Sequence, residues 1–164
     1  MSLKKRFLKD AAIYNGLITT IMLSSVFHNK EIWVHDYPPD IKEKYGPVSE
    51  EARQLARLWA IPFFVVILGW VIFATLRLKK ANNGRLSFKD AFKYIYLLFM
   101  SFWTYDLIIM DWLIFSTIQP SFIILPGTEG MAGYKDYAFH LKVSWPFILI
   151  MAIPSAIIAL FVSR

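Results

Sequence analysis

Two aspartates interrupt an apolar stretch that reads FWTYDLIIMDWLIF, and they are the residues of the chain that most suggest chemistry. Asp106 falls near the middle of the stretch and Asp111 in its second half. A carboxylate at the centre of a bilayer costs about 3 kcal/mol on insertion scales, so such residues normally face other helices and have a partner or a proton. The pair predicts an intramembrane polar site that handles protons or cations, or a salt bridge that fixes helix packing.

The geometry of an ordinary α-helix separates these two aspartates. Five residues at roughly 100° each place them roughly 140° apart around the axis and about 7–8 Å apart along it. We therefore expect two separate sites rather than a close carboxylate dyad. For Asp111 the candidate partner is Arg57, whose long side chain can reach along the membrane surface. For Asp106 the candidates are hydroxyl groups or a bound proton, because burial disfavours the charged form of a carboxyl group.

The histidines support a weaker hypothesis, a metal or haem site. His35, Asp36 and His140 combine imidazole and carboxylate groups, which suit several divalent metals. His28 and His140 are the pair that would hold a haem. Neither set has a fixed spacing such as HExxH, and the motifs of serine hydrolases, kinases and nucleotide-binding loops are missing from the sequence. The chain has no cysteine, which excludes disulfides and thiolate metal sites.

Four apolar blocks are long enough to place these residues in a membrane, since a spanning helix needs about 20 mostly apolar residues. The blocks cover approximately residues 11–27, 58–76, 91–118 and 143–162. Hydrophobic residues make up 57% of the 164 residues and charged residues only 18%, below the roughly 25% of a soluble domain. We expect a single all-helical membrane domain over residues 1–164, built as a four-helix transmembrane bundle.

Local signals predict where some of these helices begin or bend. Ser49 before two glutamates is a plausible helix start, and Ser87 followed by Asp90 resembles a capping arrangement. Pro62 falls in the first turns of the second block, where a missing N–H is tolerated, whereas Pro154 lies inside the fourth and predicts a kink.

The distribution of basic residues predicts the orientation of the helices. Lys and Arg cluster before the first block and in the connection 77–90, and they are sparse in the connection 119–142. We therefore expect both termini in the cytoplasm, with the connections 28–57 and 119–142 outside. No signal-peptidase site follows the first block, so the plasma membrane is the default location. The net charge of +6 does not indicate nucleic-acid binding, because the basic residues flank apolar blocks instead of covering one surface.

Both outer connections contain many aromatic residues, which predicts either a small ordered extracytoplasmic cap or two loops lying in the headgroup region. The FIIL run at residues 122–125 is too short to span, and it predicts a strand or a segment on the membrane surface.

The first helix has a ridge of small residues that suits close helix packing. The ridge repeats at four-residue spacing and consists of Ala12, Gly16, Thr20 and Ser24. Small residues let helix backbones approach closely in lipid. The partner is another helix of the chain or a second copy, which would make a homo-oligomer.

Two functional classes follow from these observations, with a third behind them. The first is proton, cation or small-molecule binding or translocation through the intramembrane carboxylates. The second is a structural or accessory membrane subunit whose outer cap docks a partner. The third is an enzyme at the membrane surface, which requires His35, His140 and an acidic residue to converge in one cleft.

Overall fold

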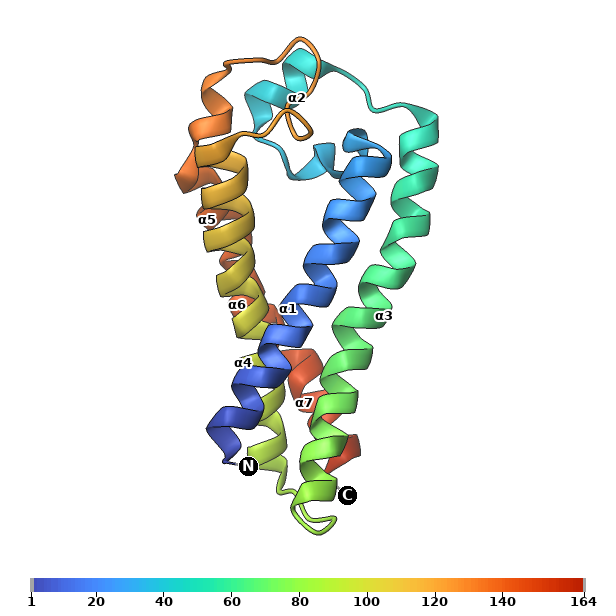
Figure 1. Ribbon diagram of the computed structural model, residues 1–164, viewed down its shortest axis with the longest axis vertical. Coiled ribbons are helices and arrows are strands. Elements are labelled where there is room, and N and C mark those ends of the chain that lie inside the picture. Colours follow the sequence, from blue (N-terminus) through green and yellow to red (C-terminus); the bar gives the residue numbers. More distant parts are fainter. Residues whose placement is uncertain (1, 164) are drawn as a thin grey trace. The chain divides into compact units, whose positions relative to one another are not determined.

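The computed structural model describes residues 2–163, and it contains four helical segments long and apolar enough to cross a membrane (Figure 1). Three shorter helices connect them. The long segments are α1 (Leu3–His28), α3 (Glu50–Ala81), α4 with η2 (Phe88–Tyr105 and Asp106–Ile118), and α5 with α6 and α7 (Tyr137–Ser144, Pro146–Ile150 and Ala152–Val162). The short ones are η1 (Lys30–Asp36), α2 (Pro39–Tyr45) and η3 (Ala132–Lys135).

The predicted helix starts at Ser49 and Ser87 are confirmed. The Ser49 hydroxyl accepts the N–H of Ala52 at 3.2 Å, and the Ser87 hydroxyl accepts the N–H of Asp90 at 3.1 Å. Both hydroxyls satisfy backbone donors that the first turn of a helix leaves open. The helix that begins after Ser49 runs without interruption into the apolar block, so Pro62 lies in its interior and not in its first turns.

The fourth apolar segment is interrupted as its prolines predict. Its helix breaks at Met151, between α6 and α7, and Pro154 follows in the first turn of α7. A proline has no N–H to donate to the carbonyl four residues earlier, and its ring crowds that carbonyl. The chain resumes helical geometry there because the first turn of a new helix needs no such donor.

No strand occurs among residues 2–163, so of the two alternatives predicted for the FIIL run, the strand is wrong, while a segment on the membrane surface stays a prediction. The chain turns at this point, with the N–H of Ile123 donating to the carbonyl of Pro120 at 3.0 Å. Ile123 and Leu125 are both buried. The apolar character of the run therefore reflects burial in a turn, which has no periodicity to read from sequence.

The structure forms two compact units. Unit 1 comprises residues 1–18, 64–105 and 144–164, and unit 2 comprises residues 19–63 and 106–143. In unit 1, α4 packs closely along α7. The interior of unit 1 includes side chains with little or no exposed surface, among them Tyr14, Val71, Ile95, Leu98 and Phe99.

A buried aspartate joins three helices of unit 1. Asp10 of α1 is 1% exposed, and its carboxylate accepts a hydrogen bond from the Tyr94 hydroxyl of α4 at 2.6 Å. Arg77 of α3 places a guanidinium nitrogen 3.9 Å from the same carboxylate, and the indole N–H of Trp70 donates to the Asp10 carbonyl at 2.9 Å. The Phe7 ring meets the Tyr94 ring edge-on at 6.0 Å. Asp10 therefore fixes the start of α1 against the end of α3 and the start of α4.

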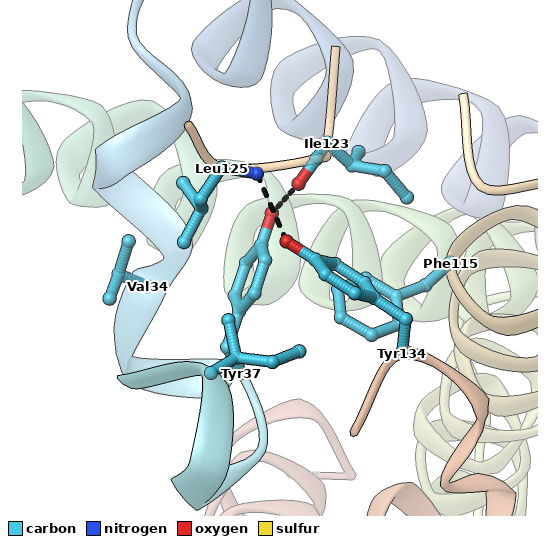
Figure 2. Packing of buried hydrophobic residues seen from close by; sticks show 7 residues of the cluster. Val34, Tyr37, Phe115, Ile123, Leu125 and Tyr134 are labelled. Atoms are coloured by element: carbon cyan, nitrogen blue, oxygen red, sulfur yellow. Dashed lines mark hydrogen bonds between the residues drawn. The ribbon is translucent and has the colours of Figure 1, made fainter. Parts of the chain in front are cut away.

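The core of unit 2 is formed by the two long connections together with Phe115 of η2, and we call it the aromatic cluster (Figure 2). Its members are Val34, Tyr37, Ile41, Phe115, Ile123, Leu125 and Tyr134. The Tyr37 hydroxyl donates to the carbonyl of Ile123 at 2.7 Å, and the Tyr134 hydroxyl accepts the N–H of Leu125 at 3.0 Å. These two bonds satisfy backbone groups of the irregular segment that would otherwise be buried without partners.

The ridge of small residues on α1 lies on exposed surface. All four residues (Ala12, Gly16, Thr20 and Ser24) are exposed, and a Cβ added at Gly16 would meet nothing within 4 Å. Its role in helix association stays a prediction.

Candidate functional site

A group of one imidazole and three carboxylates gathers in unit 2, and we call it the acid–imidazole cluster. Its members are Asp36 at the end of η1, Asp106 and Asp111 on η2, and His140 on α5, and their charges act on one another. His140 Nδ1 lies 3.4 Å from Asp111 Oδ1, an ion pair when the imidazole is protonated. The His140 side chain is 5% exposed and that of Asp111 is 25% exposed. The cluster therefore reaches from the interior of unit 2 toward its surface.

The helix that carries the two intramembrane aspartates changes type at the first of them. Residues Asp106–Ile118 form a π-helix, whose hydrogen bonds link residues five apart, as in the bond from the N–H of Gln119 to the carbonyl of Ile114 at 2.9 Å. Asp106 and Asp111 are five residues apart, so they lie on adjacent turns of about the same face. The prediction of two aspartates on divergent faces is therefore wrong, because it assumed α-helical geometry. The negative charge of Asp111 acts directly on the Asp106 carboxyl group.

Three polar atoms of this region are buried and have no protein hydrogen-bond partner among residues 2–163. They are Asp106 Oδ1, Ser116 Oγ and His140 Nε2. Ser116 lies five residues after Asp111, so the π-helix continues the polar face. Nearly all buried polar atoms in proteins have a partner, and each exception calls for an explanation. A bound proton, an ordered water or a cation supplies such a partner.

Asp36 shows the electrostatics of the cluster at its exposed side. Loss of hydration among the surrounding side chains raises the pKa of Asp36, although its side chain keeps exposed surface. The neighbouring charge of Asp111 raises this pKa further, while His35, Lys42 and His140 oppose the rise. Asp36 therefore holds a proton to higher pH than an ordinary aspartate.

Aromatic rings enclose the imidazole. The Phe115 ring contacts His140 edge-on at 4.9 Å between centroids, and the Phe139 ring does so at 5.4 Å. Phe115 also contacts Tyr37 at 4.9 Å and Tyr134 at 5.4 Å. Phe115 is thus shared between the aromatic cluster and the acid–imidazole cluster.

The partner of Asp111 differs from the one predicted. Within the part of the chain that the structure describes, Asp111 pairs with His140, while Arg57 is exposed and takes part in no ion pair. Arg57 begins the apolar part of α3, and its exposed position leaves its charge in contact with solvent or headgroups. The pairing with His140 could not be read from sequence, because the two residues lie on different helices with an irregular connection between them.

The predicted metal and haem ligands take other contacts. Among residues 2–163, no group of three or more His, Asp or Glu side chains is arranged to hold a metal, so His35, Asp36 and His140 do not form the predicted set. His35 is exposed, and its carbonyl accepts the Lys42 ammonium at 3.1 Å. His28 Nδ1 accepts the indole N–H of Trp59 at 3.3 Å. The two histidines considered for haem thus have separate partners.

The arrangement is suited to taking up and releasing protons. A carboxylate beside Nδ1 favours a proton on that nitrogen, which leaves a lone pair on His140 Nε2. The negative charge of Asp111 opposes ionisation of Asp36, so this group favours a bound proton at Asp36. Comparison with protein-family models, with curated proteins and with solved structures yields no match.

Proposed function

We propose that the chain is an integral membrane protein that binds and transfers protons through the acid–imidazole cluster. The observation that carries the proposal is the pair of buried atoms without a protein partner, Asp106 Oδ1 and His140 Nε2, in the same cluster as the Asp111–His140 pair. A purely structural site satisfies its buried polar atoms, because each one left open costs about 1–3 kcal/mol. A site that exchanges protons keeps some polar atoms without a protein partner, so that they can bind a proton.

The orientation we propose follows from the distribution of charge. The described part of unit 1 contains ten Lys and Arg residues against two acidic ones, whereas unit 2 contains seven against ten. Basic residues are retained on the cytoplasmic side of membrane proteins. We therefore place both termini in the cytoplasm and the connections 28–57 and 119–142 outside, as a small ordered cap, with the plasma membrane as the default location.

The proposed proton route uses the difference in exposure within unit 2. Asp36 is exposed and exchanges protons with solvent, and the charges of Asp36 and Asp111 both act on the more enclosed Asp106. His140 Nε2 is the open position at the enclosed end of this route, and Asp111 lies on the Nδ1 side of the same ring.

A second candidate function is a structural or accessory subunit. The Asp111–His140 pair favours it, because breaking a buried pair is costly and such pairs fix helix packing. Under this alternative the aromatic cluster supports a docking surface, and Asp106 is a sealed residue.

The test is carboxyl infrared difference spectroscopy of the protein in nanodiscs, in H₂O and in D₂O, from about pH 5 to about pH 9, a range above the pKa of an ordinary carboxyl group. We expect a carboxyl band that titrates, shifts on deuteration, disappears in Asp106→Asn and persists in the control Glu43→Gln, an exposed carboxylate. A band that neither titrates nor exchanges would sink the proton proposal and leave the structural subunit.

A further inference from the structure

The cytoplasmic end that we assign to unit 1 has an excess of positive charge without partners. Eight of its basic residues take part in no ion pair among residues 2–163. They are Lys4, Lys5, Arg6, Lys9, Lys80, Arg85, Lys89 and Lys93. Arg77 faces Asp10, and the Lys79 ammonium donates to the carbonyl of Val162 at 2.7 Å, so these two cations are engaged inside the unit.

The two acidic residues of unit 1 offset only part of this charge. Asp10 is 1% exposed and is occupied by Tyr94 and Arg77. The Asp90 carboxylate accepts the Ser87 hydroxyl at 2.6 Å at the start of α4. With ten basic residues against two acidic ones, the described part of unit 1 keeps an excess of eight positive charges. These charges repel one another, which destabilises this end of the unit unless an anionic surface meets it.

The fold holds the cations together at one end of the unit. They lie at the start of α1, at the end of α3, in the following turn and at the start of α4 (Figure 1). The contacts of Asp10 with Tyr94 and Arg77 join these three helix ends. The charge is thus displayed on ordered helices and not on a flexible tail.

Exposed apolar side chains alternate with the cations. Leu3 is 60% exposed, Leu8 56% and Phe88 43%. Lysines next to exposed apolar residues at the end of a spanning helix place their stems along acyl chains and their ammonium groups among headgroups. A soluble anionic partner has no use for the apolar part of this pattern, whereas a phospholipid uses both parts.

We propose that this basic end of unit 1 binds the headgroups of anionic phospholipids. The inference rests on the membrane placement in the proposed function and not on its proton chemistry. Each Lys or Arg near an anionic surface contributes roughly a fivefold gain in affinity, so several unpaired cations on ordered helices select anionic over neutral lipids. The bound lipid replaces the missing carboxylates and stabilises the helix ends that Asp10 joins.

The test measures the enrichment of a fluorescent phosphatidylglycerol around the protein by energy transfer from its tryptophans, against a labelled phosphatidylcholine. Nanodiscs contain phosphatidylcholine with about one third phosphatidylglycerol, enough for competition at the surface. The test variant combines Lys4→Gln, Lys5→Gln, Lys9→Gln and Lys89→Gln. The control combines Lys44→Gln, Arg57→Gln, Lys135→Gln and Lys142→Gln, which removes the same charge from unit 2.

We expect the wild-type protein to enrich phosphatidylglycerol over phosphatidylcholine, and the test variant to lose at least about tenfold of this selectivity. The control should change little, because a lysine raises the affinity only where it lies beside the anionic lipid. Equal enrichment in both variants, or an equal loss in both, overturns the proposal. A salt titration of the wild-type protein tests it without mutation, because enrichment must fall as screening rises. Asp106→Asn must retain the enrichment, so failure of the proton proposal can be told apart from failure of the lipid proposal. A chain that does not enter nanodiscs overturns the membrane placement and this inference with it.

Discussion

Removing one oxygen atom tests whether the two long connections form a folded core or a pair of surface loops. Tyr134 is 1% exposed, and its hydroxyl accepts the N–H of Leu125 at 3.0 Å and contacts the Thr128 hydroxyl at 2.7 Å. The Thr128 hydroxyl keeps a second partner, the Leu125 carbonyl at 2.8 Å. In Tyr134→Phe, therefore, the Leu125 N–H is the group that loses its acceptor.

The magnitude follows from this count. A buried donor left without a partner costs about 1–3 kcal/mol, and the ring of phenylalanine fills the same space, so no cavity adds to the cost. For a protein of this size each kcal/mol lowers Tm by about 2–4 °C, and a loss near 2 kcal/mol lowers it by about 4–8 °C. The assay is thermal unfolding in detergent, followed by tryptophan fluorescence.

Tyr137→Phe is the matched control. Its hydroxyl contacts that of Thr117 at 2.9 Å, a similar bond between exposed residues. Water replaces an exposed bond, so the change in unfolding free energy should stay within about 0.5 kcal/mol. Equal shifts in Tm for the two variants would refute the buried core and favour two loops whose aromatics lie in the headgroup region.

Three further predictions concern pH and backbone fit. Burial and the charge of Asp111 raise the pKa of Asp36. The contribution of Asp36 to stability is therefore present below the ordinary pKa near 3.9 and is lost as pH rises through the raised value. Asp36→Asn should be more stable than the wild type at neutral pH in thermal unfolding, and the difference should vanish in acid. Burial raises the pKa of Glu31, but hydrogen bonds from Ser49 and Tyr45 together outweigh this and lower it overall. Glu31→Gln should therefore show the opposite sign, a loss of stability at neutral pH that shrinks as pH falls through the lowered value. The same sign in both variants would contradict the assignment. A Cβ at Gly133 would collide with the Asp40 carboxylate, which accepts the Gly133 N–H at 2.9 Å, so Gly133→Ala should cost about 1–2 kcal/mol in urea unfolding and little in an Asp40→Ala background.

The long helices could be predicted because their signals are local. Apolar blocks of sufficient length mark each spanning segment, and Ser49 and Ser87 mark two helix starts through side-chain bonds that reach only three residues along the chain. The break before Pro154 is equally local, since proline lacks the donor that the helix needs.

The acid–imidazole cluster could be predicted only in part. Asp106 and Asp111 stand out because carboxylates are rare in apolar segments, but their common face depends on a π-helix that no local pattern announces. The partner of Asp111 depends on how the connection 119–142 folds, and that connection is held by tertiary bonds such as that of Tyr37 to Ile123. Distant contacts of this kind leave no periodic trace.

Asp10 does not stand out in the sequence, for a related reason. It lies directly after a run of basic residues, where an acidic side chain looks like part of a solvated helix end. The structure buries it against Tyr94, 84 residues away, and Arg77. An isolated acid at the border between basic and apolar residues is a signal worth testing in sequences of this class.

The ring of Phe115 belongs to two groups of residues at once, because it contacts the imidazole of His140 and the rings of Tyr37 and Tyr134. A change in the charge of the imidazole alters the environment of that ring, and a shift of the tyrosines alters it from the other side. Thermodynamic reciprocity then applies. If protonation changes the free energy of tyrosine packing, a ligand that changes the packing of the tyrosines must change the proton affinity by the same free energy. If the proposed proton function holds, the connections belong to the proton-binding site, and a molecule that binds to them would change its proton occupancy.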